Sequence, residues 1–156
     1  MEIHIYTDGS CFNNPGPGGW GVYVPVIHKE MYGRDKITTN NKMELTAMKH
    51  AISYILSDSI KIDFGIQSIN NISFKIHTDS TYVKNGWETW MSKWIKNNWK
   101  TSGNNMVKNK ELWLELYILK EKLRDLNVSY NLNWVKAHNG DINNEYVDKI
   151  AKYHQN

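Results

Sequence analysis

Residues 3–10 read Ile3-His4-Ile5-Tyr6-Thr7-Asp8-Gly9-Ser10, and they are the clearest guide to the fold. Ile3 and Ile5 alternate with more polar neighbours, the period of two that is typical of a β-strand with one buried face. We expect this strand to end near Thr7, because Asp8 is followed by glycine in a turn-forming pair. The first strand therefore carries an acidic side chain at its carboxyl end.

The same periodicities predict the other elements. Residues 13–19 combine Asn, Pro and Gly so densely that they predict a loop. Alternating apolar residues predict strands at residues 20–26, 30–38, 73–78 and 128–135, the first of them meeting an edge or a bulge at Pro25. Helical spacing predicts a helix capped by Asn40 or Asn41, another starting at Asp79-Ser80, and others over residues 110–126 and 143–153. Residues 57–71 are interpreted as a long connection.

This order of elements predicts an α/β fold with one mixed, five-stranded sheet flanked by helices. The first three strands follow one another closely and should pair antiparallel. The last two are reached through helical crossovers and should lie parallel to the first. The length of 156 residues fits a single domain over residues 1–156.

Four acids fall where such a sheet brings side chains together. Asp8 and Asp79 end the first and fourth strands, Glu44 lies in the first turn of the first helix, and Asp148 lies on the last helix. Sites in open α/β sheets form at the carboxyl ends of the strands. Converging carboxylates repel unless cations neutralise them, and Mg²⁺ prefers oxygen ligands. Two such ions about 3.5–4 Å apart suit in-line displacement at phosphate. Taken singly, each acid also fits an ordinary turn, cap or helix-surface role.

A basic segment, residues 84–110, carries six lysines and only one acid, Glu88. Trp90, Trp94 and Trp99 lie among these lysines. Aromatic side chains between cations suit a surface that follows a nucleic-acid backbone, although the spacing also fits core packing. We favour the nucleic-acid interpretation.

His138 directly follows the fifth predicted strand. A loop histidine beside a strand end is suited to carry protons, although taken alone an ordinary surface position is the preferred explanation.

The composition indicates where in the cell the protein is expected. Cys11 is the only cysteine, so an internal disulfide is excluded and a reducing, cytoplasmic location is favoured. No apolar stretch approaches the length of a membrane span, and the first residues lack a signal-peptide pattern. We therefore expect no membrane association.

Four motifs, in order and over nearly the whole chain, resemble type 1 ribonuclease H of the bacterial type. They are Tyr6-Thr7-Asp8-Gly9-Ser10 with Asn14-Pro15-Gly16-Pro17-Gly18-Gly19, Thr38-Thr39-Asn40-Asn41-Lys42-Met43-Glu44-Leu45, Thr78-Asp79-Ser80 with Tyr82-Val83, and Trp134-Val135-Lys136 with His138, Gly140, Asn144-Glu145 and Asp148. Their combination is far more specific than any one of them.

The resemblance implies hydrolysis of the RNA strand of RNA–DNA hybrids with two Mg²⁺ ions, or Mn²⁺ as an alternative, giving 5′-phosphate products. It implies that Asp8, Glu44, Asp79 and Asp148 are catalytic and bind the metals, and that His138 assists proton transfer or product release. Glu44 would also touch a ribose 2′-OH, the group that distinguishes RNA from DNA. The implied hybrid contacts are Asn14, Asn40 and Asn41 in the minor groove, Thr39 at a DNA phosphate, and Trp90, Lys93, Lys96, Trp99 and Lys100 in a basic protrusion at about residues 84–110.

This sequence departs from the family pattern in places. Residues 57–71 lengthen the link from Glu44 to Asp79 relative to compact bacterial relatives. The protrusion has Ile95, Asn97 and Asn98 where relatives are more basic, which predicts weaker and more salt-sensitive hybrid binding.

Other protein classes share parts of this pattern. A hybrid-binding module without activity would lack one of the acids. Integrases, transposases and junction resolvases share the metal chemistry but not the Thr-Asp-Gly-Ser context. A reverse-transcriptase-derived domain is closer, and Met1 together with the compact length favours a free-standing, monomeric protein instead.

Overall fold

The computed structural model describes residues 1–155, and Asn156 lies outside the described residues. Five strands form one sheet in the order β3-β2-β1-β4-β5. β1 pairs antiparallel with β2 and parallel with β4; β2 pairs antiparallel with β3, and β4 pairs parallel with β5. The strands are β1 (Glu2–Cys11), β2 (Gly16–Val24), β3 (Lys29–Thr38), β4 (Ser73–Thr78) and β5 (Ser129–Trp134). This confirms the predicted mixed sheet and its directions.

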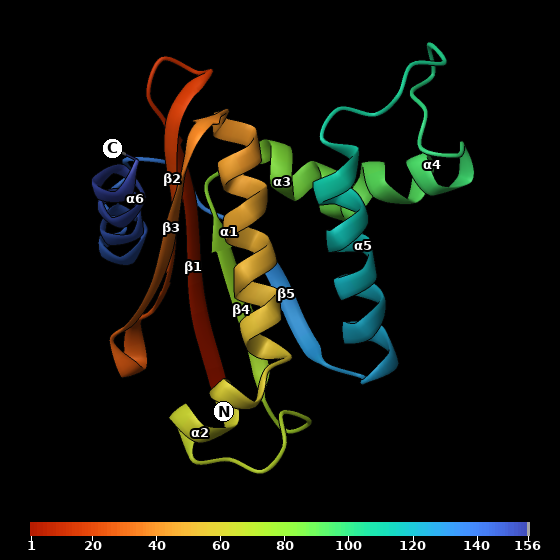
Figure 1. Ribbon diagram of the computed structural model, residues 1–156. Coiled ribbons are helices and arrows are strands. Elements are labelled where there is room, and N and C mark those ends of the chain that lie inside the picture. The colour runs from red at the N-terminus through yellow and green to blue at the C-terminus, as the bar shows by residue number, and fades with distance from the viewer. Residues whose placement is uncertain (156) are drawn as a thin grey trace.

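Helices flank the sheet, as Figure 1 shows. They are α1 (Asn40–Ile55), α2 (Asp58–Phe64), α3 (Thr81–Asn85), α4 (Met91–Lys96), α5 (Lys110–Asp125) and α6 (Ile142–His154). α1 packs against β1 and β2 and also against α5, while α6 packs against β1, β2 and β3. Among residues 1–155 no helix is long and apolar enough to cross a membrane.

The main core lies between the sheet and α1 with α5. Ile3 and Ile5 of β1 are fully buried there, together with Phe74 and Ile76 of β4 and Trp113 of α5. Each fully buried aliphatic or aromatic side chain contributes about 1.5–3 kcal/mol by leaving water. Ile3 and Ile5 alternate with more polar residues because their side chains lie on the face of β1 that α1 covers.

Several predicted boundaries differ from the structure. β1 continues past Thr7 to Cys11, and residues 16–19, predicted as loop, begin β2. Glycine is tolerated in this strand because β2 runs against α6, where a Cβ on Gly19 would lie 2.3 Å from the carbonyl oxygen of Ala151. Pro25 ends β2 and opens a short 3₁₀ turn, Pro25–Ile27.

The first helix is capped by Thr39 rather than by Asn40 or Asn41. The Thr39 side chain accepts a hydrogen bond from the backbone N–H of Lys42 at 3.2 Å. Threonine, like asparagine, presents an oxygen to the unpaired N–H groups at a helix start, so local sequence does not distinguish the candidates.

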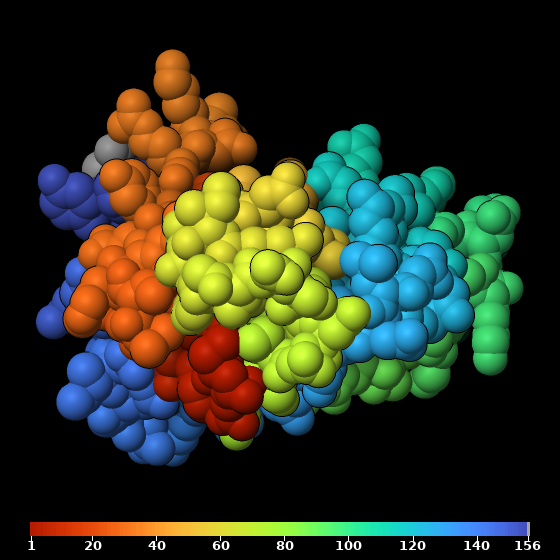
Figure 2. Space-filling view, turned by 90° about the horizontal axis from the view of Figure 1, so that it is seen from below, coloured from red at the N-terminus to blue at the C-terminus, as the bar shows by residue number. Residues whose placement is uncertain are grey.

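Residues 57–71, predicted as a connection, contain α2. This helix ends at Gly65, whose left-handed φ of 63° terminates it. Its Asp63 accepts a hydrogen bond from the Tyr54 hydroxyl at 2.7 Å and pairs with Lys29 at 3.0 Å. Figure 2 shows this segment spread over the end of the molecule that carries the N-terminus.

The helix predicted from Asp79-Ser80 is divided in the structure. α3 is followed by a π-helical turn, Gly86–Trp90, and then by α4. A Cβ on Gly86 would lie 2.1 Å from the Trp113 ring, so glycine lets α5 approach. α4 and the loop after it form the protrusion seen beside α5 in Figure 1.

Candidate active site

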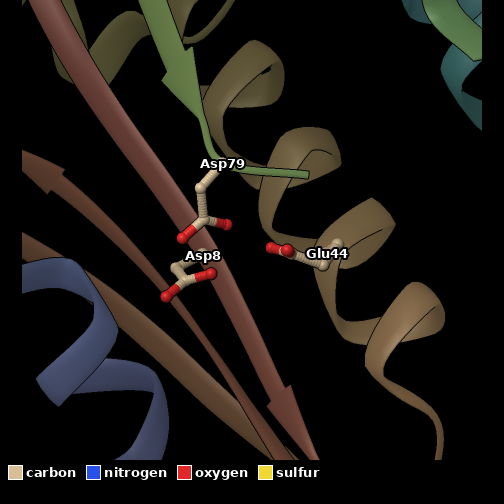
Figure 3. A group of neighbouring side chains, drawn as sticks. All are labelled: Asp8, Glu44 and Asp79. Atoms are coloured by element: carbon tan, nitrogen blue, oxygen red, sulfur yellow. The ribbon is translucent and has the colours of Figure 1, made fainter. Parts of the chain in front are cut away.

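Asp8, Glu44 and Asp79 converge at one end of the sheet. Each offers a carboxylate oxygen, and these oxygens all lie within 4.8 Å of one another. Figure 3 shows the three side chains pointing toward a common space from β1, α1 and the end of β4. The parallel pairing of β1 with β4 brings Asp8 and Asp79 together, as the sequence predicted.

Asp8 is the most enclosed of the three acids, with 3% of its surface exposed. The backbone N–H of Gly9 donates to its Oδ1 at 2.9 Å, which leaves the other oxygen without a donor. Within residues 1–155, Oδ2 of Asp8 and Oε1 of Glu44 are both buried without a hydrogen-bond partner. A buried, unpaired carboxylate oxygen is costly, so these atoms indicate a cationic ligand.

The electrostatics of the cluster support the same conclusion. Burial, followed by the charges of Glu44, Asp79 and Asp148, raises the pKa of Asp8 well above its usual range. Burial and the charge of Asp79 likewise raise the pKa of Glu44 well above its usual range. Without cations, these groups therefore resist ionisation.

Asp148 approaches the group from α6. It is close enough to Asp8 for its charge to raise the pKa of that residue. Its Oδ2 also lies 3.1 Å from Nζ of Lys152, one turn further along the same helix. Asp148 therefore lies beside the three-acid group and forms an ion pair with Lys152 of the same helix.

The donor set fits divalent metal ions. The three clustered acids supply only oxygen, the ligand type that Mg²⁺, Mn²⁺ and Ca²⁺ prefer. A cation between them would satisfy the unpaired oxygens of Asp8 and Glu44 and relieve the repulsion that raises their pKa values.

His138 lies in the exposed loop between β5 and α6. Its backbone is left-handed, with φ of 53°, and Gly140 nearby has φ of 84°. The loop ends where Asp141 caps α6 by accepting from the N–H of Asn144 at 3.0 Å. The structure thus places His138 on the segment that leads into the helix of Asp148, but not within the three-acid group.

The predicted minor-groove residues gather at the start of α1. The backbone N–H of Asn40 donates to Oδ1 of Asn14 at 3.0 Å, although the two residues lie 26 positions apart. Asn14, Asn40 and Asn41 are exposed, and Thr39 is partly buried. These residues therefore form one polar surface around the start of the helix that carries Glu44.

The protrusion combines packing with an exposed basic surface. Trp94 packs edge-on against Trp113 at 5.3 Å and lies next to both Trp90 and Trp99, so these rings join the protrusion to α5. A groove of about 450 Å³ lies beside them and is lined by Trp90, Lys93, Trp94, Asn97, Lys100, Thr101 and Ser102. The tryptophans therefore pack against one another and against α5, and Trp90 and Trp94 also line a groove together with two lysines.

A second groove escaped prediction from sequence. It has a volume of about 470 Å³ and is lined by Lys42, Met106, Asn109, Lys110, Glu111 and Leu112. Lys42 comes from α1, whereas Asn109 and Lys110 come from the start of α5. The run Lys108-Asn109-Lys110 in the sequence indicates a basic surface. That this run lies near Lys42 could be known only from the packing of α1 against α5.

Comparison with known proteins identifies the family and agrees with the fold. The sequence model of the RNase H family matches residues 1–155. Ribonuclease H of Orientia tsutsugamushi (strain Boryong) is 45% identical over 97% of this chain and 80% of its own length. Ribonuclease HI of Xylella fastidiosa (strain 9a5c) is 42% identical over 97% of this chain and 90% of its own. This chain belongs to the ribonuclease H family.

Solved structures show the same fold at lower identity. LC9-RNase H1, a type 1 RNase H with the type 2 active-site motif, has a TM-score of 0.75 at 24% identity, covering 99% of this chain and 72% of its own. LC11-RNase H1, solved in complex with an RNA/DNA hybrid, has a TM-score of 0.67 at 19% identity, covering 98% of this chain and 96% of its own.

Proposed function

We propose that this protein is an endonuclease that hydrolyses the RNA strand of RNA–DNA hybrids and leaves 5′-phosphate products. The observation that carries the proposal is the group of three converging acids, in which Asp8 and Glu44 hold buried oxygens without partners. Membership of the ribonuclease H family and the names of its relatives supply the reaction class.

Asp8, Glu44, Asp79 and Asp148 are the residues that would hold two Mg²⁺ ions, with Mn²⁺ as an alternative. Bound ions of this kind activate a water and stabilise the leaving 3′ oxygen. Asp8 would supply its ligand oxygen from β1, and Asp148, whose Oδ2 pairs with Lys152, would supply one from α6. Glu44 faces the same space and would also contact a ribose 2′-OH.

His138 would exchange protons with the reacting groups or with the departing product. It lies on an exposed loop between two rigid elements, β5 and α6, so it can approach a substrate placed over the acids. Its role is separate from metal binding because it stands outside the acid group.

Hybrid binding would follow the polar and basic surfaces on either side of the site. Asn14, Asn40 and Asn41 at the start of α1 would enter the minor groove, and Thr39 would contact a DNA phosphate. Trp90, Lys93, Lys96, Trp99 and Lys100 would contact the DNA strand at the protrusion. Lys93, Lys96 and Lys100 form no ion pair within residues 1–155, which supports a polyanionic partner.

The groove between α1 and α5 extends this surface. Lys42 and Lys110 supply the cations that phosphate contacts require, while the Asn109 amide beside them donates to the Tyr82 hydroxyl at 3.1 Å. A backbone phosphate in this groove would set the register of the hybrid without reading its sequence. We further propose that the chain works as one domain, as a monomer and in the cytoplasm.

The deciding experiment is cleavage of an end-labelled RNA–DNA hybrid with Mg²⁺, beside duplex RNA, duplex DNA and an EDTA control. We expect internal cuts in the RNA of the hybrid alone, and none with EDTA or with Asp8→Asn. A protein that binds the hybrid but leaves it intact with both Mg²⁺ and Mn²⁺ is a binding module. Cleavage of duplex DNA or of a DNA junction would instead assign it another substrate.

A further inference from the structure

Trp134 contacts the backbone of a candidate metal ligand. It is the last residue of β5, and its indole N–H donates to the carbonyl oxygen of Asp79 at 3.0 Å. The two residues are 55 positions apart. The sheet register brings them together, because Trp134 pairs with Thr78 at the end of β4.

Asp79 lies in the short segment between β4 and α3, and hydrogen bonds fix the residues before and after it. The N–H of Val135 donates to the carbonyl of Thr78 at 2.9 Å, just before Asp79. Ser80, just after it, donates its N–H to Oγ1 of Thr78 at 3.1 Å and caps α3 by accepting from Val83 at 3.1 Å. Between these two anchors, the indole N–H binds the carbonyl of Asp79 itself. The carboxylate of the same residue joins those of Asp8 and Glu44.

Packing alone does not explain this side chain. Trp134 is 42% exposed, whereas the large aromatic residue of the core, Trp113, is fully buried. An indole so exposed gains less from leaving water than a buried one. Its hydrogen bond, in contrast, reaches the backbone of a site residue.

We infer that Trp134 is a positioning residue for metal binding: its indole N–H holds the Asp79 backbone so that the carboxylate stays directed at Asp8 and Glu44. The inference rests on the proposed function only in taking these acids as the metal site. Removal of one such hydrogen bond corresponds to about a three- to ten-fold change in an equilibrium constant.

The test compares Trp134→Phe, which removes the N–H and keeps an aromatic ring, with the matched variant Trp20→Phe. Trp20 lies on β2 and stacks on His50 at 4.0 Å rather than on Asp79, so its variant controls for the same substitution on another strand. Mg²⁺ binding to each protein is measured by calorimetry, together with the Mg²⁺ dependence of hybrid cleavage, the KM for hybrid and the Tm.

We expect Trp134→Phe to weaken Mg²⁺ binding about three- to ten-fold and to raise the Mg²⁺ needed for half-maximal cleavage equally, with KM at saturating Mg²⁺ unchanged. Unchanged Mg²⁺ affinity, or an equal loss in Trp20→Phe, would overturn the inference. A higher KM with normal Mg²⁺ affinity would make the ring a substrate contact instead. Calorimetry needs no substrate, so it gives an answer even if wild type does not cut hybrid.

A measurement on the wild type covers the case in which Trp134→Phe does not fold. The indole N–H resonance of Trp134 should exchange slowly with solvent and should shift when Mg²⁺ binds. Fast exchange without any Mg²⁺-dependent shift would contradict the inference.

Discussion

A Cβ on residue 9 would lie 2.3 Å from the backbone nitrogen of Glu44, so Gly9 and Glu44 are in direct backbone contact across β1 and α1. This distance is too short for any side chain at position 9. The same glycine donates its N–H to Asp8. The approach of the helix to the strand therefore depends on a residue adjacent to one acid and in contact with another.

We expect Gly9→Ala to lower the free energy of unfolding by about 1–3 kcal/mol, because α1 must move away from β1. Cleavage should fall as well, since Glu44 moves with the helix. Thermal unfolding and cleavage rates check both effects. Gly103→Ala is the control, because a Cβ there meets nothing nearer than 3.7 Å. A Gly9→Ala protein as stable and active as wild type would refute the close contact.

Asp8→Asn should abolish cleavage and yet stabilise the metal-free protein at neutral pH. Burial, and then the neighbouring acids, raise the pKa of Asp8 in the folded state above its value of about 4 in the unfolded chain. The stability that protonated Asp8 contributes is complete below pH of about 4 and is lost as the pH rises through the folded-state pKa. The variant keeps a neutral side chain at every pH and avoids this loss.

We therefore expect the Tm of Asp8→Asn in EDTA to exceed that of wild type by about 2–4 °C at pH 8, corresponding to about 1 kcal/mol, with the difference vanishing near pH 4. Added Mg²⁺ should raise the Tm of wild type more than that of the variant. Asp125→Asn, at the exposed end of α5, should show neither effect. A pH-independent difference would point to a cause other than ionisation.

Replacing both Lys93 and Lys96 by alanine should raise the KM for hybrid and leave kcat nearly unchanged. These exposed lysines lie on α4, which Figure 1 shows at the edge of the molecule beyond α5. Loss of two phosphate contacts should reduce the slope of log affinity against log salt by about 2. Filter-binding titrations at several salt concentrations measure it. Lys61→Ala with Lys122→Ala removes the same charge elsewhere, and an equal change in slope there would leave the protrusion without a special role.

His138→Ala should lower kcat by about 10²-fold, because a positioned proton carrier contributes on that scale. Mg²⁺ binding by calorimetry should stay as in wild type, since His138 lies outside the acid group. His28→Ala is a close control, because His28 is exposed and has a similar φ of 51°. A His138→Ala protein with reduced Mg²⁺ affinity would place the histidine among the metal contacts instead.

The sequence by itself determined the order and direction of the strands and the positions of the acids. Alternation in Ile3 and Ile5, and the helical crossovers before β4 and β5, are local patterns that a half-buried strand and a parallel pair require. Asp8 and Asp79 could be placed together because parallel strands end at the same edge of a sheet. Local patterns could not distinguish Thr39 from Asn40 as the cap of α1. They also could not show that residues 57–71, which look like a polar connection, contain the helix α2.

Only the tertiary structure decided which distant groups meet. The indole of Trp134 reaches the carbonyl of Asp79, and Lys42 faces Asn109 across a groove, because sheet register and helix packing place them there. Gly19 and Gly21 of β2 lie directly against α6, a close approach that a side chain at either position would prevent. Such contacts depend on the distance between packed backbones, a quantity that no single stretch of sequence encodes.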